Sequence, residues 1–383
     1  MTLFHCLFAV ACLALCCNLV AGAEQASARW SEQKANDWYA KQPWLVGCNF
    51  IPSNAINQLE MWQPESFDLA TIDKELALAE GLGFNSVRVF LHDLLWEQDS
   101  KGFLDRVDKF LATADKHGVG VMFVLFDGCW DPQPRFGKQR DPRPHTHNSG
   151  WVQSPSRDVL KDPARHESLA PYVKGVIARF KDDRRVHAWD IYNEPDNTNV
   201  NSYGANSKTK TELPDEQKKA MALALITKAF GWAREVNPSQ PITSGVWAGS
   251  WKTLHEMSPM ARFCAEQSDV ITFHTYQPLD DVKARVADLK QFNRPILCTE
   301  YMARPAGSTF ETILPYFKEQ KIAAYNWGFV DGKSQTIYPW DSWPKEYKAE
   351  PPAWFHDIFR KDGTAYRENE VKLIRELTGA GAK

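Results

Sequence analysis

Residues 186–197 read VHAWDIYNEPDN, a largely apolar run with a polar ending. A short apolar run bounded by turn residues is typical of a strand that is buried on both faces of a sheet. The run ends in Asn193, Glu194 and Pro195, so an amide and a titratable acid stand where the strand stops. This stretch predicts a buried strand that delivers a carboxyl group to the edge of a sheet.

Seven more runs of the same kind follow or precede it at short intervals. They lie at residues 44–50, 86–90, 119–126, 241–247, 269–276, 295–301 and 323–329. Segments with helical spacing separate them: residues 69–79, for example, repeat apolar side chains every three or four positions and stop before Gly81 and Gly83. Further helices are expected at 107–114, 163–182, 214–235, 281–291, 309–320 and 368–378.

Eight strands that alternate with helices over roughly 300 residues have the count and length of a (β/α)8 barrel. The sequence therefore predicts an α/β protein built as a single TIM barrel, with long loops at the carboxyl face of the strands. A doubly wound open sheet is the structural alternative.

The composition excludes some classes of partner. The 383 residues are 43% hydrophobic and 24% charged, with a net charge of −3 and no long basic run. A nucleic-acid partner is therefore not expected, because phosphate binding needs clustered positive charge. We expect a monomer whose partner is a carbohydrate, for the reasons given below.

The first 23 residues form an uncharged apolar run that ends in Ala21, Gly22 and Ala23. Small residues at this position are typical of a signal-peptidase site, so residues 1–23 are predicted to be a secretory signal. A retained anchor is the alternative. Residues 24–383 are then the folded domain, without a membrane span after signal removal, and the protein is expected to be secreted or periplasmic.

Four cysteines remain after that segment: Cys48, Cys129, Cys264 and Cys298. Their spacing fits neither a metal-binding pair nor a dense disulfide framework, so no pairing is predicted.

In a TIM barrel the chemistry takes place at the carboxyl ends of the strands, so polar residues that end the apolar runs are candidates for the site. Two of them are acids, Glu194 at the end of the fourth run and Glu300 at the end of the seventh. Strands four and seven face each other across an eight-stranded barrel. The other candidates at strand ends are Asn49, Arg88, Asp127, Asn193, Trp247, His274, Tyr276 and Trp327.

Two carboxyl groups on either side of a sugar linkage are what glycosidic hydrolysis requires, one to protonate the leaving oxygen and one to attack. Burial of two nearby acids separates their pKa values, which leaves one neutral and one charged. Arg88 would favour the charged form of Glu300, and Tyr276 could donate a hydrogen bond to it. Trp327 offers a flat apolar surface for a pyranose ring.

The motifs SVRVF (86–90), YNEP (192–195), FHTY (273–276), CTEY (298–301) and NW (326–327), in this order along the chain, resemble the clan A retaining glycoside hydrolases, which include family 5 cellulases and mannanases. The resemblance covers about residues 44–330. It implies hydrolysis of β-linked plant-type polysaccharide or derived oligosaccharides by double displacement, with no cofactor and no metal. It implies Glu194 as acid/base, Glu300 as nucleophile, Asn193 as a contact to the 2-hydroxyl, Arg88, His274 and Tyr276 as supports, and Trp327 as the sugar platform.

The chain departs from family 5 after the third strand. These enzymes usually carry a histidine there, whereas this chain reads LFDGCWDP, with Asp127 and Trp130. The irregular segment 127–160 that begins here is expected to wall one side of the cleft. Its His145 and His147, with Asp141, are expected to be solvent-exposed rather than metal ligands. A second polar segment, 202–216, follows the fourth strand.

Two other functions stay open. A transglycosylase would use the same acids but transfer the sugar to a hydroxyl group instead of water. A non-catalytic carbohydrate-binding barrel would keep the aromatic cleft but would not need the acid pair. Trp130, Trp151, Trp247 and Trp251 fit either a core or a sugar-binding position, and the identity of the sugar depends on loop side chains.

Overall fold

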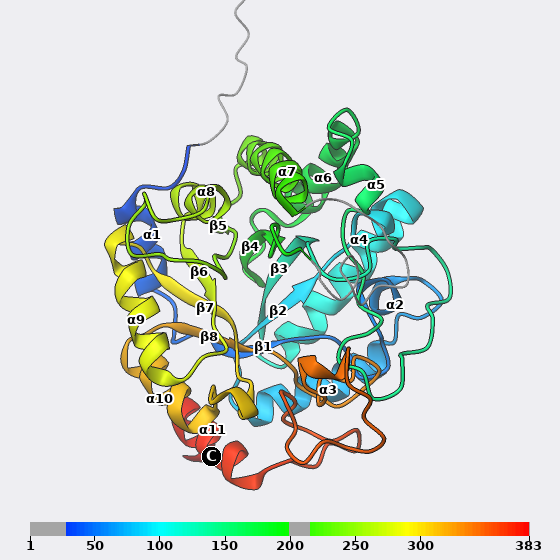
Figure 1. Cartoon of the computed structure of the whole chain (residues 1–383), viewed down its shortest axis with the longest axis vertical. Coiled ribbons are helices and arrows are strands. Elements are labelled where there is room, and N and C mark those ends of the chain that lie inside the picture. Colours follow the sequence, from blue (N-terminus) through cyan, green and yellow to red (C-terminus); the bar gives the residue numbers. More distant parts are fainter. Residues whose placement is uncertain (1–27, 199–214, 383) are drawn as a thin grey trace, which may run out of the picture.

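The computed structural model describes residues 28–198 and 215–382. The predicted signal at 1–23 and most of the polar segment 202–216 lie outside the described residues. The described chain forms a ring of parallel strands surrounded by helices (Figure 1). The strands are β1 (Val46–Asn49), β2 (Ser86–Phe90), β3 (Gly120–Asp127), β4 (Val186–Asn193), β5 (Ile242–Thr243), β6 (Ile271–His274), β7 (Ile296–Tyr301) and β8 (Ala323–Asn326).

The eight strands are hydrogen-bonded in the order β5-β4-β3-β2-β1-β8-β7-β6. Backbone contacts between the segment after β5 and strand β6 join the two ends of this series. The Val246 N–H donates to Thr272 O at 3.0 Å, and the His274 N–H donates to Val246 O at 3.0 Å. The sheet therefore closes into the predicted (β/α)8 barrel, and the open doubly wound sheet is excluded.

Eleven α-helices of the described residues lie around the strands (Figure 1). At α3 the carboxylate of Asp68 accepts hydrogen bonds from the Ala70 and Thr71 N–H groups, which caps the first turn. The helices are α1 (Glu32–Ala40), α2 (Gln58–Trp62), α3 (Leu69–Gly81), α4 (Asp93–Lys116), α5 (Arg157–Leu160), α6 (Ala170–Phe180), α7 (Asp215–Val236), α8 (Pro259–Gln267), α9 (Leu279–Leu289), α10 (Phe310–Glu319) and α11 (Glu368–Thr378).

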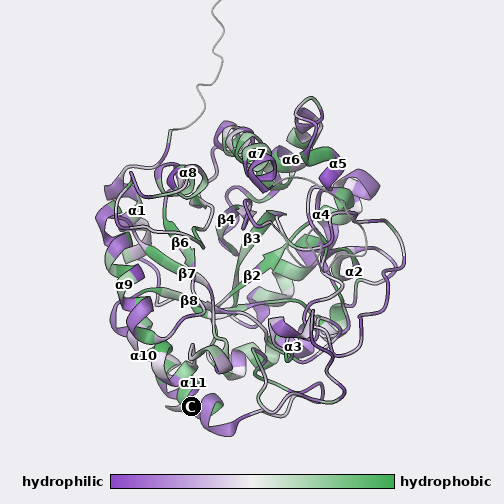
Figure 2. Ribbon diagram, viewed as in Figure 1, coloured by the Kyte–Doolittle hydropathy of each residue, from purple (hydrophilic) through white to green (hydrophobic). Residues whose placement is uncertain are grey.

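Hydrophobic residues gather in the strands and on the inner faces of the helices, as Figure 2 shows. Successive residues of a strand point to opposite faces. Phe123 of β3 accordingly belongs to the large core between sheet and helices, and its neighbour Met122 belongs to a smaller core with Ala188 and Leu297. Both faces of the sheet are buried, as the apolar runs predict. The four cysteines of the described chain, Cys48, Cys129, Cys264 and Cys298, are buried free thiols.

Some predicted boundaries are wrong. The fifth strand is predicted at 241–247, but β5 contains only Ile242–Thr243. The reason is that Ser244 leaves the ladder: its N–H donates to Ser268 Oγ, and its hydroxyl donates to Tyr192 O. The helix predicted at 163–182 is divided into a short 3-10 turn at His166–Leu169 and α6. Helices α1, α2, α5 and α8 are not predicted from the sequence.

Candidate active site

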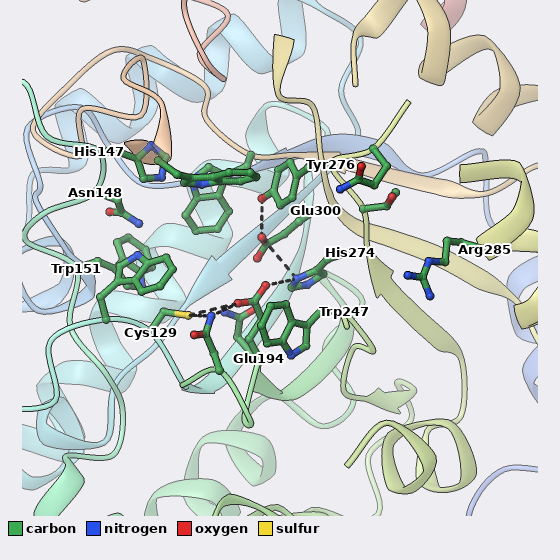
Figure 3. A pocket seen from close by; sticks show the side chains of 17 residues that line it. Cys129, His147, Asn148, Trp151, Glu194, Trp247, His274, Tyr276, Arg285 and Glu300 are labelled. Carbon is green, nitrogen blue, oxygen red and sulfur yellow. Dashed lines mark hydrogen bonds and ion pairs between the residues drawn. The ribbon is translucent and has the colours of Figure 1, made fainter. Parts of the chain in front are cut away.

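The structure brings the two predicted acids together at the carboxyl face of the barrel. His274, at the end of β6, lies between them, with Nδ1 2.8 Å from Glu194 Oε1 and 3.6 Å from Glu300 Oε2 (Figure 3). One oxygen of each glutamate and one ring nitrogen of His274 all lie within 4.8 Å of one another. The side chains of Glu194 and Glu300 are 11% and 7% exposed, so both acids reach the pocket but are largely desolvated.

The backbone at Glu194 is unusual. This residue directly follows β4 and has a φ of +40°, in the left-handed region that non-glycine residues seldom adopt. Gly128 packs against the same peptide, and a Cβ at Gly128 would lie only 2.1 Å from Glu194 O. Residues held in such conformations gather at functional sites, where the surrounding structure fixes them.

Glu300 accepts two strong hydrogen bonds. Arg88 Nη1 lies 3.0 Å from Glu300 Oε1, and the Tyr276 hydroxyl donates to Oε2 at 2.7 Å. The guanidinium of Arg88 is fully buried and also contacts Asp190 Oδ2 at 2.7 Å and Asn49 Oδ1 at 2.8 Å. Arg88 is therefore locked in place beneath Glu300 by strands β1, β2 and β4.

A second chain of contacts fixes Asn193. Arg88 Nη2 donates to Asn193 Oδ1 at 2.7 Å, and Asn193 Nδ2 donates to Asp127 Oδ1 at 3.0 Å. Asp127 is fully buried and its other oxygen accepts from Trp151 Nε1 at 2.5 Å. Asp127, which stands where family 5 enzymes usually carry a histidine, thus fixes the side chains of Asn193 and Trp151 by accepting hydrogen bonds from both.

Glu194 has different neighbours. Asn197 Nδ2 donates to Glu194 Oε2 at 2.7 Å, and the Cys129 thiol donates to the same oxygen at 3.5 Å. Lys218 of α7 is buried behind this pair, and its ammonium group donates to Gly128 O at 3.1 Å and to Asn197 O. Among the described residues, no lysine or arginine forms an ion pair with Glu194.

The electrostatic environments of the two acids differ accordingly. Burial raises the pKa of Glu194, against the hydrogen bonds from Asn197 and Cys129. Burial also raises the pKa of Glu300, but the positive charge of Arg88 and the hydrogen bond from the Tyr276 hydroxyl oppose this rise. Burial lowers the pKa of His274 to about 4, so this ring is neutral at neutral pH and Arg88 supplies the positive charge. Glu300 is thus the better site for a negative charge and Glu194 the better site for a proton.

A cavity of about 370 Å³ opens over the acids. Trp327 and Trp130 are half-buried in its lining, whereas Trp340 is 40% exposed. The lining consists of Cys129, Trp130, His147, Asn148, Trp151, Asn193, Glu194, Asn197, Trp247, His274, Thr275, Tyr276, Gln277, Arg285, Glu300, Trp327 and Trp340.

The candidate residues from the sequence divide into two sets. Those that line the cavity are Glu194, Glu300, Asn193, His274, Tyr276, Trp327 and Trp130. Arg88, Asp127 and Asn49 lie outside the lining. Arg88 contacts Glu300 and Asp127 contacts Asn193, whereas Asn49 contacts Arg88. Of the ambiguous tryptophans, Trp151 and Trp247 line the cavity and Trp251 is 1% exposed in the core.

The expectation of a solvent-exposed histidine pair in segment 127–160 is wrong for His147. Its ring is buried, and Nδ1 bonds to the carbonyl of Tyr338 at 2.8 Å because the loop after β8 packs against this segment. In the described part of the chain, the one group of side chains close enough to hold a metal is Glu194, His274 and Glu300. Arg88 and Tyr276 already donate hydrogen bonds to Glu300 of that group.

Several residues of the cavity are not predicted from the sequence. They are Cys129, His147, Asn148, Asn197, Gln277, Arg285 and Trp340. They lie on loops or on helix α9, and no periodicity or motif marks them. The end of an apolar run indicates where a strand ends. It does not indicate which loop, distant in sequence, packs over that end of the strand.

Comparison with known proteins finds relatives whose sequence identity to this chain is low. No family model matches the chain. A protein named "Probable mannan endo-1,4-beta-mannosidase A-1" from Aspergillus terreus is 24% identical over 185 residues, which are 40% of this chain and 45% of that protein. The match thus spans about half the length of the curated relative.

Solved structures match over more of the chain. An exo-β-1,4-mannosidase from Opitutaceae bacterium strain TAV5 has a TM-score of 0.57 at 21% identity, over 88% of this chain and 60% of that one. A β-mannanase from the blue mussel Mytilus edulis has a TM-score of 0.52 at 17% identity, over 78% and 89% of the two chains. These structures share the barrel fold with this protein. No helix among the described residues has the length and apolar character needed to cross a bilayer.

Proposed function

We propose that this protein is a retaining glycoside hydrolase that cleaves β-glycosidic bonds by double displacement. The observation that carries this proposal is the approach of Glu194 and Glu300 oxygens to within 4.8 Å in one cavity. Retaining enzymes hold their carboxyl groups about 5–5.5 Å apart, whereas inverting enzymes need about 6.5–9.5 Å to place a water molecule between acid and sugar.

In the first step Glu300 attacks the anomeric carbon and forms a covalent ester. The bond to the leaving oxygen breaks, and Glu194 protonates that oxygen. In the second step the Glu194 carboxylate takes a proton from water, the water oxygen attacks the anomeric carbon, and the ester bond to Glu300 breaks. Two inversions at the same carbon return the original β configuration.

The neighbours of the acids support this division of roles. Arg88 and Tyr276 donate to Glu300, which favours the charged nucleophile. Glu194 lacks a cationic partner among the described residues and is buried, which favours the protonated acid. Asn193 lines the cavity beside both acids, where we assign it to the 2-hydroxyl, and Trp327 is the platform beneath the reacting sugar.

For the substrate we propose β-1,4-linked mannan or its oligosaccharides first, because the relatives described above are named as β-1,4-mannosidases and a β-mannanase. A β-glucoside is the second candidate, since a β-glucosidase also shares the fold with a TM-score of 0.53. Residues 24–383 would form the catalytic domain of an exported enzyme.

The test is the anomeric form of the first product. The protein is incubated with β-manno- and β-gluco-oligosaccharides and with aryl β-glycosides, and the sugar released is followed by NMR before it mutarotates. We expect the β anomer first. Release of the α anomer would overturn the double displacement, and the absence of cleavage over the whole panel would overturn the hydrolase.

A further inference from the structure

Two long loops meet at one end of the cavity. The loop after β3 carries His147, and the loop after β8 carries Tyr338, whose carbonyl accepts from His147 Nδ1 at 2.8 Å. The backbone N–H of Asn148 donates to Ser334 O at 2.8 Å, and the N–H of His147 donates to Ser342 Oγ at 2.9 Å. Direct bonds between the loops give this end of the cavity a fixed shape.

We call this boundary the end wall and define it as His147, Asn148, Trp151 and Trp340. Figure 3 shows His147, Asn148 and Trp151 together on the side of the acids away from Arg285. Trp340 lies over Tyr276 with 5.0 Å between ring centroids. His147, Asn148 and Trp151 of the end wall therefore border the acids on one side (Figure 3).

Little space lies behind the end wall. Asn148, Trp151 and Trp327 line the main cavity and also a second, separate cavity on the side of strands β1 and β2. That second cavity has a volume of about 20 Å³, and Asn49 and Phe90 also line it. A cavity needs about 10–15 Å³ to hold one water molecule, so this space accepts water and not a sugar ring.

The position of Trp327 indicates which end of the bound substrate faces the end wall. Trp327 is the proposed platform for the sugar whose anomeric carbon is attacked. Trp151 of the end wall packs edge-on against it, with 5.7 Å between ring centroids. The end wall thus stands at the far side of the transferred sugar, and the leaving part of the substrate extends toward Trp247 and Arg285.

We propose that the enzyme is exo-acting and removes single sugar residues from the non-reducing end of a β-linked chain. This inference rests on the proposed function. A chain that continued beyond the transferred sugar would run into Asn148 and Trp151. His147 supplies a recognition group: its Nδ1 must carry the proton because its partner is a carbonyl, so in the neutral ring Nε2 is an acceptor for a hydroxyl group.

The experiment uses tetrasaccharides of β-1,4-linked mannose and of β-1,4-linked glucose, each with a fluorescent label at the reducing end. Each is prepared with a free non-reducing end and with the 4-hydroxyl of that end blocked by a bulky ether. We expect a labelled trisaccharide as the first product of the free form, and at least a hundredfold slower cleavage of the blocked form. Labelled disaccharide or monosaccharide as the first product, or equal cleavage of both forms, would overturn the exo assignment.

The outcomes separate the two proposals. Cleavage at internal bonds with retention of configuration contradicts the end wall but leaves the hydrolase intact. No cleavage of any form contradicts the hydrolase itself.

A variant tests the end wall directly. Asn148 has a φ of +47°, so Asn148→Gly removes the side chain without straining the backbone. We expect the rate on the blocked form, relative to the free form, to rise at least tenfold. Asn293→Gly is the matched control, because Asn293 also has a positive φ, of +50°, and lies outside the cavity lining. An unchanged ratio in Asn148→Gly would show that Asn148 is not part of the barrier.

Discussion

Arg88 contacts Glu300 through a 3.0 Å bond between Nη1 and Oε1, and both side chains are buried. Glu194, on the opposite strand, has Asn197, Cys129 and a neutral His274 as its hydrogen-bond partners. This difference distinguishes two acids of the same residue type in one cavity. The predictions that follow test whether it also separates their roles.

Glu300→Gln should lower kcat by at least about 10⁴-fold, because the amide cannot form the covalent ester. The melting temperature should change little, since Arg88 keeps its contact with Asp190. Glu75→Gln is the matched control: Glu75 is also buried, and burial raises its pKa to about 7, but it lies outside the cavity lining. Steady-state kinetics and thermal unfolding of both variants check this prediction, and near-normal turnover in Glu300→Gln would contradict it.

Glu194→Gln should lose activity in a way that depends on the leaving group. Removal of a general acid costs about 10²–10⁴-fold when the leaving oxygen needs a proton. A dinitrophenyl leaving group needs none, so ester formation with such a substrate should continue while its hydrolysis slows. Added azide should attack the ester and yield a β-glycosyl azide. A uniform loss on all substrates without azide rescue would argue against the acid/base role.

The acidic limb of the pH profile should report Glu300, which must be ionised to attack. Activity therefore rises with pH through the pKa of Glu300. Tyr276→Phe removes a donor to the Glu300 carboxylate, so it should raise that pKa and move the acidic limb to higher pH. The measurement is kcat/KM against pH, and an acidic limb at its original position would contradict the assignment.

The alkaline limb should report Glu194, which must be protonated to act as an acid. Activity therefore falls as pH rises through the pKa of Glu194. Asn197 donates to the Glu194 carboxylate and favours its charged form, so Asn197→Ala should move the alkaline limb to higher pH and leave the acidic limb in place. If the acidic limb moved instead, the roles of the two glutamates would be exchanged.

Asp357 should make stability depend on pH. Burial raises its pKa to about 7, although both of its oxygens accept from Thr336. The folded state then holds more protons than the unfolded state between about pH 4 and 7, so the free energy of unfolding falls as pH rises through this window. In Asp357→Asn, the decrease in the free energy of unfolding over this pH window should be smaller by up to about 4 kcal/mol. Asp362→Asn, at an exposed aspartate, serves as control in denaturant titrations at several pH values.

The sequence predicts the barrel and the acids because both depend on local patterns. Apolar runs mark buried strands. Glu194 directly follows β4 and Glu300 lies near the end of β7, so closure of the sheet brings the two acids together. The end wall depends on a different kind of contact. Asn148 and Ser334 are joined through backbone groups, which every sequence supplies, so no side-chain pattern could indicate that their loops meet.

The burial of His147 and Trp251 could not be predicted from the sequence either. A histidine in a proline-rich polar segment is expected to be exposed, yet the loop after β8 covers His147. Trp251 follows the fifth strand like Trp247, but it packs edge-on against Phe273 in the core. Residue type and position along the chain do not decide burial where loops fold back on the barrel.

The central claim is that Glu300 forms a covalent bond with the sugar. The most direct measurement is to incubate the protein with 2-deoxy-2-fluoro-β-mannosyl and β-glucosyl fluorides, which slow the second step, and then to map the labelled peptide by mass spectrometry. We predict one fluorosugar per chain, attached to Glu300. A label on Glu194 or on any other residue, or turnover of natural substrate with inversion of configuration, would contradict the account.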